Sequence, residues 1–188
     1  MLWIALVVAA LLLAGLVATY LTAFNRLRRQ DVAVQEALAG IDVQLTRRAD
    51  LVPNLVSSVS AYLRHERGVL EELTSARSGV RTAIESGSVA HRAAAGQRLE
   101  QVMGTVLAVA EAYPELQASQ SFVQLQQELA ATEDQVALAR EYYNSAVRAL
   151  NTSVATVPWT FFTGAAGVSR QPFFEAPAGA EVPPIVQF

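Results

Sequence analysis

The residues best suited to catalysis are two histidines and the glutamate beside one of them: His65, Glu66 and His91. Histidine is the commonest general base in enzymes and a frequent metal ligand. A zinc-protease helix needs a second histidine four residues after the first, but Val69 occupies that position. A di-iron bundle needs a glutamate three residues before its inward histidines, and neither histidine has one. These spacings therefore predict no metal site.

Other catalytic groups lack the sequence context that their chemistry requires. The chain has no cysteine, which excludes disulfides, thiolate catalysis, cysteine-based zinc sites and a lipid-modified cysteine. Serine and threonine are abundant, yet neither a Gly-x-Ser-x-Gly turn nor a phosphate-binding glycine loop occurs. We therefore expect a protein that is not an enzyme, with no cofactor and no small-molecule substrate. The net charge of −3 also provides no basic surface for nucleic acid.

Three charged side chains fall on the apolar stripes of predicted helices: Asp31, Arg48 and Glu66. Burying an unpaired charge is unfavourable, so an inward position requires a partner. If the chain folds back at Pro53, Arg48 and Glu66 are expected to meet across that turn. Such a pair would fix the register of two helices rather than perform catalysis.

Residues 25–156 show helical periodicity and no alternating strand pattern. The clearest stripe recurs at alternating spacings of three and four residues in the last long helix, at Phe122, Leu125, Leu129, Thr132, Val136, Ala139, Tyr143, Ala146 and Leu150. A first helix is expected to reach Pro53, a second to run from about 54 to 85, a third from about 90 to 112, and a fourth to follow Pro114. The pattern predicts an all-α fold in which an N-terminal transmembrane helix continues into an antiparallel up-and-down four-helix bundle.

The first domain, residues 1–24, is predicted to be the transmembrane anchor. Residues 2–24 carry no charge, and a helix of this length spans about 34 Å, enough for the hydrocarbon core of a bilayer. Arg26, Arg28 and Arg29 flank the C-terminal side, so the positive-inside rule places the N-terminus outside and the bundle in the cytoplasm. A cleavable signal peptide is the alternative, but its basic residues would precede the apolar run.

The last domain, residues 157–188, combines prolines and glycines with large aromatic side chains and is predicted to be an irregular tail. An up-and-down topology returns the chain to the membrane side, so the tail should begin near the bilayer. Its aromatic residues could lie among the lipid headgroups or pack on the bundle, and packing on the bundle is favoured. These residues are Trp159, Phe161, Phe162, Phe173 and Phe174.

Several longer motifs occur in order along the chain. They are Ile-Asp-Val-Gln-Leu at 41–45, Arg-Arg-Ala-Asp-Leu-Val-Pro-Asn-Leu-Val at 47–56, His-Glu at 65–66, Leu-Glu-Glu-Leu-Thr at 70–74, Leu-Ala-Val-Ala-Glu-Ala-Tyr-Pro-Glu-Leu at 107–116, Leu-Gln-Gln-Glu-Leu at 125–129, Thr-Glu-Asp at 132–134, Ala-Arg at 139–140 ahead of Tyr-Asn at 143–144, and Phe-Phe-Glu-Ala at 173–176. On these motifs the chain resembles the LemA family of bacterial membrane proteins over nearly its full length. The resemblance implies an N-terminal span, a short outside terminus and an antiparallel helical bundle, and it adds no enzymatic activity.

The motif residues are interpreted as structural. Arg47, Arg48, Asp50, Pro53 and Asn54 form a helix-turn motif whose charges can cap or bridge, while Tyr113 and Pro114 end a helix at another turn. Between Leu150 and Arg170 the chain departs from the family pattern, because Pro-Trp-Thr-Phe-Phe at 158–162 replaces a more regular passage.

These features favour a membrane-anchored scaffold or adaptor that presents helical faces to protein partners. One alternative is a self-assembling protein that organises the membrane as a homo-oligomer. Another is an accessory subunit of a membrane enzyme, such as a protease, whose active residues lie in a companion chain. The sequence does not identify the partner.

Overall fold

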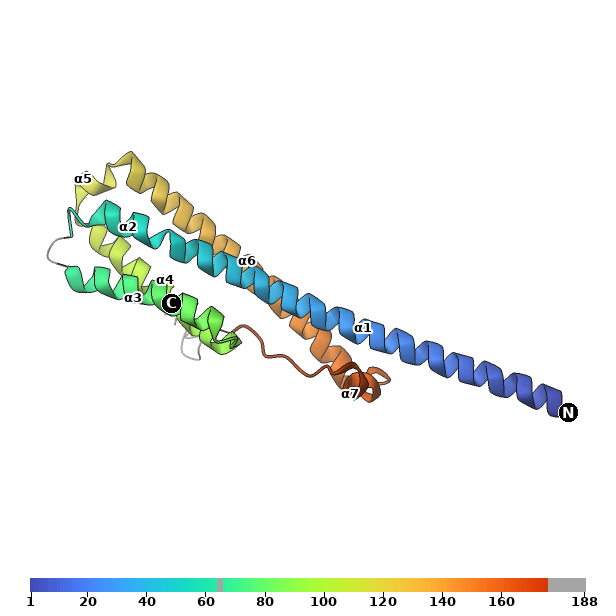
Figure 1. Cartoon of the computed structure of the whole chain (residues 1–188). Coiled ribbons are helices and arrows are strands. Elements are labelled where there is room, and N and C mark those ends of the chain that lie inside the picture. Colours follow the sequence, from blue (N-terminus) through green and yellow to red (C-terminus); the bar gives the residue numbers. More distant parts are fainter. Residues whose placement is uncertain (64–65, 176–188) are drawn as a thin grey trace, which may run out of the picture. The chain divides into compact units, whose positions relative to one another are not determined.

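The regular elements in the described part of the chain, residues 1–63 and 66–175 of a computed structural model, are all helices (Figure 1). They are α1 (Leu2–Asp50), α2 (Val52–Val59), α3 (Arg67–Glu85), α4 (Val89–Ala110), α5 (Pro114–Gln117), α6 (Gln120–Ala155), the 3-10 helix η1 (Trp159–Phe162) and α7 (Thr163–Ala166). The predicted all-α fold is confirmed.

The chain divides into two units. Residues 1–38 and 142–172 form unit 1, in which the first part of α1 is accompanied by the end of α6, η1 and α7. Residues 39–141, with the chain from Phe173 onward, form unit 2. In unit 2 the end of α1, then α3, α4 and the start of α6 run alternately up and down, as the sequence predicts (Figure 1).

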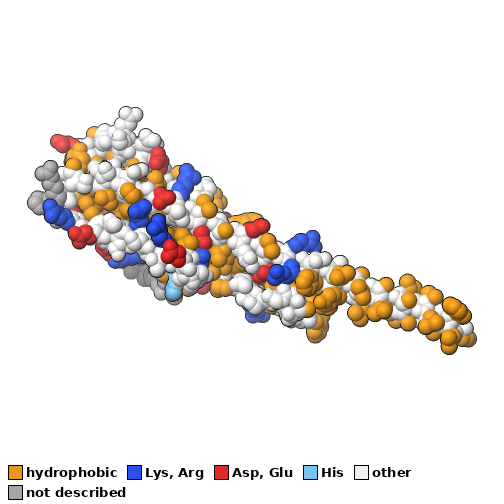
Figure 2. Space-filling view, viewed as in Figure 1, with side chains coloured by type: hydrophobic (Ala, Val, Ile, Leu, Met, Phe, Trp, Pro, Cys, Tyr) orange, Lys and Arg blue, Asp and Glu red, His pale blue; other side chains and the backbone are white. Residues whose placement is uncertain are grey.

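The N-terminal part of α1 has the character of a transmembrane helix. Its most apolar stretch has a mean hydropathy of 2.6 and none of that stretch is buried against protein. Residues 1–22 are all exposed, and the first buried side chain is Ala23. Figure 2 shows the hydrophobic side chains of this segment as continuous surface. A helix with such a surface is long and apolar enough to cross the hydrocarbon core of a bilayer.

Pro53 marks the break between α1 and α2. The ring nitrogen of proline cannot donate the helical hydrogen bond that the carbonyl of Ala49 would accept. Arg77 of α3 supplies a donor instead, with its Nε 3.1 Å from that carbonyl oxygen. Because Leu51 keeps right-handed helical geometry (φ −78°, ψ −18°), α2 continues close to the line of α1 (Figure 1).

The expectation that the chain folds back at Pro53 is therefore wrong, and so is the single second helix from 54 to 85. Buried Val52, Leu55 and Val59 extend the inward stripe of α1 through α2. The direction of the chain differs between α2 and α3, so the reversal comes after α2 (Figure 1). A proline in the first turn of a helix removes one hydrogen bond but does not require a reversal.

The turn from α3 to α4 lies at Ser86, Gly87 and Ser88, between the ends predicted for the second and third helices. Gly87 adopts a left-handed conformation (φ +73°), which glycine reaches without a Cβ clash. Ser88 then caps α4, its Oγ accepting a hydrogen bond from the backbone N–H of His91 at 3.3 Å. His91 is thereby placed at a helix start, where its Nδ1 lies 3.3 Å from the Ser86 hydroxyl.

The predicted seam of α6 is buried along most of its length. Phe122 and Leu150 have no exposed surface, and Thr132 is 2% exposed. Toward the end of the helix Val147 is buried, whereas the expected Ala146 is only half-buried. A straight helix has 3.6 residues per turn, so a strict seven-residue repeat drifts around its surface.

In unit 2, α4 packs closely against α1 at Gly96. A Cβ added to Gly96 would stand 3.0 Å from Cδ2 of Leu45. Gly104, two turns further along α4, has no such neighbour within 4 Å. The glycine at 96 thus permits contact between the two helices.

We expect Gly96→Val to lower the free energy of unfolding by about 1–3 kcal/mol, since it overpacks this contact. Gly104→Val is the matched control and should be neutral or slightly stabilising, because valine favours a helix more than glycine does. Thermal unfolding of the full chain in detergent micelles, followed by circular dichroism, measures the difference. Equal melting temperatures for the two variants would contradict the close packing.

Candidate functional site

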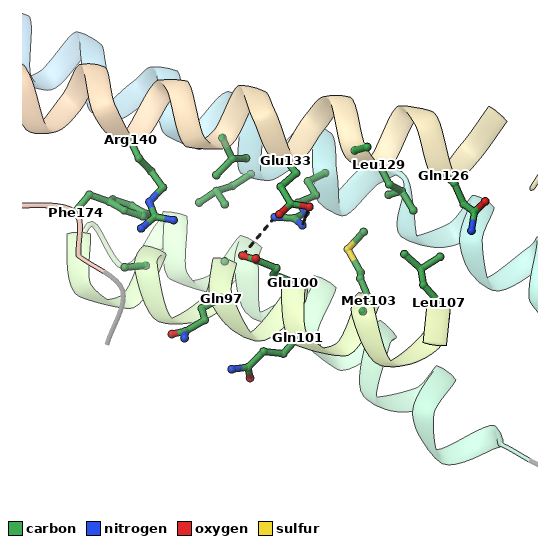
Figure 3. Close-up of a pocket in the computed structure, with 17 residues that line it drawn as sticks. Gln97, Glu100, Gln101, Met103, Leu107, Gln126, Leu129, Glu133, Arg140 and Phe174 are labelled. Atoms are coloured by element: carbon green, nitrogen blue, oxygen red, sulfur yellow. Dashed lines mark ion pairs between the residues drawn. The ribbon is translucent and has the colours of Figure 1, made fainter. Parts of the chain in front are cut away.

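A hollow of ≈ 720 Å³ lies in unit 2 between α4 and α6, with residues of α1 lining it (Figure 3). Met103 and Leu107 of α4 face Leu129 of α6 across it. Small residues explain why the helices leave this space: Ala93, Gly96 and Gly104 on α4 and Ala130 on α6 all line it. We call this hollow the groove.

Arg48 of α1 lines the groove as a buried cation. The residue is 5% exposed, yet its nearest carboxylates stand beyond hydrogen-bonding distance. Its Nη1 lies 3.8 Å from Oε2 of Glu100, and its Nη2 lies 3.6 Å from Oε2 of Glu133. These two glutamates come from α4 and α6, and their side chains are 48% and 58% exposed. Figure 3 shows them converging from facing helices.

The predicted pair of Arg48 with Glu66 is therefore wrong, although Arg48 is buried and charge-paired. Glu66 precedes the first residue of α3, where its side chain makes no capping hydrogen bond. The prediction placed a reversal at Pro53, whereas the chain reverses after α2 and Arg48 pairs with Glu100 and Glu133 instead. Buried Nε of Arg48 has no hydrogen-bond partner within the described residues.

One end of the groove is closed by Phe174. This side chain is 4% exposed, and the guanidinium carbon of Arg140 lies 5.6 Å from the centre of its ring, a cation–π arrangement. Phe173 is 38% exposed. Of the predicted aromatic tail residues, Phe174 thus packs on the bundle as favoured from the sequence.

The tightest buried ion pair of unit 2 joins Asp42 of α1 to Arg92 of α4. Arg92 Nε donates to Oδ1 of Asp42 at 2.6 Å and Nη2 donates to Oδ2 at 3.0 Å, a bidentate geometry. Nη2 also donates to the carbonyl of Ile84 in α3 at 3.1 Å. The pair thus ties three helices together. The sequence analysis did not predict this ion pair. Its one indication in the sequence was the presence of Asp42 in the motif at 41–45.

The remaining residues of the helix-turn motif lie on the surface around the α1–α2 break. Arg47, Pro53 and Asn54 are exposed. Asp50 lies 3.9 Å from Nη2 of Arg77, the residue that also binds the Ala49 carbonyl. The expected capping of this turn thus comes from α3 rather than from the motif's own charges.

The second predicted turn motif lies between α4 and α5. Pro114 begins α5, and Tyr113 before it packs edge-on against Tyr62, with ring centres 6.5 Å apart. His65, which the sequence offered as a catalytic group, lies outside the described residues, as does Ala176 of the last motif. The described residues contain no group of three or more His, Cys, Asp or Glu side chains able to hold a metal.

In unit 1 the start of the tail packs beside the end of the transmembrane segment. The guanidinium carbon of Arg26 lies 4.6 Å from the centre of the Trp159 ring, and Phe162 packs edge-on against Tyr20 at 5.8 Å. The short helices η1 and α7 occupy a region that was predicted to be irregular. Phe161, between the two packed aromatics, is 76% exposed.

The other two predicted flanking arginines make local contacts on α1. Arg28 lies 3.6 Å from Oδ2 of Asp31, whose residue is 9% exposed, and Gln35 donates to the same oxygen at 3.2 Å. Arg29 donates from Nε to the carbonyl of Asn25 at 3.2 Å. Asp31 is thus a nearly buried acid with a partner, as its place on the stripe requires.

The tail is held to α6 by two hydrogen bonds between Asn151 and Gln171, which we call the Asn151 clasp. Asn151 Nδ2 donates to the carbonyl of Gln171, and its Oδ1 accepts from the Gln171 backbone N–H, both at 2.9 Å. The Tyr143 hydroxyl donates to the carbonyl of Pro172 at 2.9 Å. Neither residue was predicted to bind the tail.

The described residues form a helical bundle whose N-terminal helix is long and apolar enough to cross a membrane, with a groove of mixed apolar and charged lining. The chain belongs to the LemA family, whose family model matches residues 37–188. It is also 24% identical over 204 residues to magnetosome protein MamQ 2 of Paramagnetospirillum magneticum, and 24% identical over 198 residues to magnetosome protein MamQ of Magnetospirillum gryphiswaldense. Each alignment covers 93% of this chain and 73% of the relative.

We expect Asp42→Ala to lower the free energy of unfolding by about 3 kcal/mol, because it leaves Arg92 buried without its carboxylate. Glu133→Ala is the matched control: it removes a half-exposed carboxylate and should cost less than about 1 kcal/mol. Thermal unfolding of the full chain in micelles gives both values. If the two variants lose similar stability, the Asp42–Arg92 pair does not hold the helices as described.

Removing the clasp should release the tail. In Asn151→Leu, trypsin should cut after Arg170 several-fold faster than in the wild-type chain, because both hydrogen bonds to Gln171 are lost. Thr152→Leu changes an exposed neighbour on α6 and is the control. Timed digestion with mass spectrometry measures the rates, and an unchanged rate in Asn151→Leu would show that the clasp does not hold this segment.

Proposed function

We propose that this LemA-family chain is a membrane-anchored adaptor whose groove binds a segment of a partner protein. The observation that supports this most strongly is Arg48, a buried arginine that lines an open groove and whose Nη1 and Nη2 have their nearest carboxylates beyond hydrogen-bonding distance. Leaving a buried donor unsatisfied is unfavourable in an isolated fold. A bound acceptor removes that cost.

The dimensions of the groove suit a peptide segment better than a small molecule. Its lining on α4 extends from Ala93 to Leu107, about 21 Å at 1.5 Å per residue. That length accommodates about four turns of helix. Apolar side chains of the segment would pack on Met103, Leu107 and Leu129, in the manner of a helix in a hydrophobic groove.

The charges around Arg48 specify the acceptor. Glu100 and Glu133 already place two carboxylates near one guanidinium, so a further carboxylate would be repelled. A neutral carbonyl, from the backbone or from an asparagine or glutamine side chain, fits this position. The partner segment is therefore proposed to be largely apolar with one such carbonyl facing Arg48.

We further propose that the bundle lies in the cytoplasm, since Arg26, Arg28 and Arg29 follow the span and basic residues remain on that side. We propose no enzymatic activity. Neither the LemA family nor the magnetosome protein MamQ is named for an enzymatic activity. An adaptor and an accessory subunit would both bind a partner in the groove. The two roles differ in the partner, which is an enzyme only in the case of the accessory subunit.

A photo-crosslinking amino acid placed at Leu107, in the wall of the groove, tests this proposal in cells that naturally make the protein. Leu138 on α6 is the matched control, because it is 57% exposed and does not line the groove. We expect a discrete adduct with another protein from position 107 and none from 138. Arg48→Gln should reduce the adduct from position 107 several-fold without loss of the folded bundle.

Two outcomes would contradict the adaptor proposal. An adduct from position 107 that contains only a second copy of this chain would support self-assembly instead. Equal adducts from 107 and 138, or adducts that Arg48→Gln leaves unchanged, would show that the groove is not a binding site.

A further inference from the structure

The segment around η1 exposes large apolar side chains at a defined place on unit 1. Val157 is 72% exposed and Phe161 is 76% exposed, although the segment is folded and packed. Its neighbours Trp159 and Phe162 are partly covered by α1. The exposed pair therefore belongs to an ordered surface rather than to a loose chain.

The geometry of a 3-10 helix explains this division. Residues three apart are eclipsed in a 3-10 helix, so Trp159 and Phe162 share one face, and this face packs on α1. Phe161 is on a different face and so points away from α1. The same backbone thus fixes two aromatic residues against protein and directs a third outward.

The contacts with α1 place the segment at the edge of the transmembrane stretch. Tyr20 lies in the uncharged run and Arg26 is its first flanking arginine, so the two are about 9 Å apart along the helix. Phe162 packs on Tyr20 and Trp159 packs on Arg26. The segment accordingly spans the depth at which a bilayer changes from hydrocarbon to headgroups.

We propose that residues 157–162 form a second contact with the bilayer beside the transmembrane helix. Phe161 and Val157 insert between the lipid headgroups and the first carbons of the acyl chains. Trp159, covered by Arg26, lies at headgroup level, where amphipathic aromatic rings are favoured. This surface continues the apolar surface of α1, and lipid that covers residues 2–24 also covers these side chains. The inference does not depend on the adaptor function.

Spin-label accessibility in the full chain tests this contact, and the absence of cysteine allows single labels without other changes. Phe161→Cys and, as a second probe, Val157→Cys carry a nitroxide in vesicles of phosphatidylcholine and phosphatidylglycerol. Leu16→Cys, 68% exposed on the span, is the control for lipid. Arg148→Cys, exposed on α6 in the same unit, is the control for water. Oxygen partitions into lipid and a nickel complex stays in water, so the ratio of their collision rates reports depth.

We expect the oxygen-to-nickel ratio at 161 and 157 to exceed that at 148 several-fold and to fall below that at 16. A ratio at both probes equal to that at 148 would overturn the proposal, because the side chains would then face water. Low access of both reagents at the two probes, with dipolar broadening between labels, would show that a second copy covers the surface and would also overturn it.

Discussion

A change of surroundings along α1 is the constraint on which the rest of the structure depends. The side chains of residues 1–22 are all exposed, whereas from Ala23 a side chain is buried every three or four residues as far as Val59 in α2. Apolar surface must leave water in both stretches, but lipid receives it in the first and neighbouring helices receive it in the second. In the second stretch, the helices of unit 2 and the tail of unit 1 supply the protein surface that covers these buried side chains.

Buried charge has two different roles in unit 2. The Asp42–Arg92 pair is joined by two short hydrogen bonds, and Arg92 also donates to a backbone carbonyl, so the pair favours one alignment of α1, α3 and α4. Arg48 is held more loosely, by two half-exposed carboxylates beyond hydrogen-bonding distance. A bidentate pair suits structure, whereas an arginine that faces a groove, with its carboxylates beyond hydrogen-bonding distance, suits recognition.

The periodicity of the sequence predicted those features that arise within a single helix. The long apolar N-terminal helix, the apolar stripe of α6 and the break between residues 85 and 90 follow from local spacing, and the structure confirms them. Contacts between helices were not predictable in this way. Arg48 pairs with Glu100 and Glu133 because the chain reverses after α2, and Pro53 gave the wrong position for that reversal. The Asn151 clasp depends on backbone groups of the tail, which carry no sequence signal.

Cysteine scanning along α1 tests the central claim most directly, with single cysteines at Val8, Leu12, Leu16, Asn25 and Arg29 and a membrane-impermeant maleimide. The account predicts no labelling at 8, 12 and 16 under any condition, and labelling at 25 and 29 only after the membrane is permeabilised. Reaction at 12 or 16 would contradict a transmembrane segment. Reaction at 25 and 29 in intact cells would place the bundle on the outer side and contradict the proposed orientation.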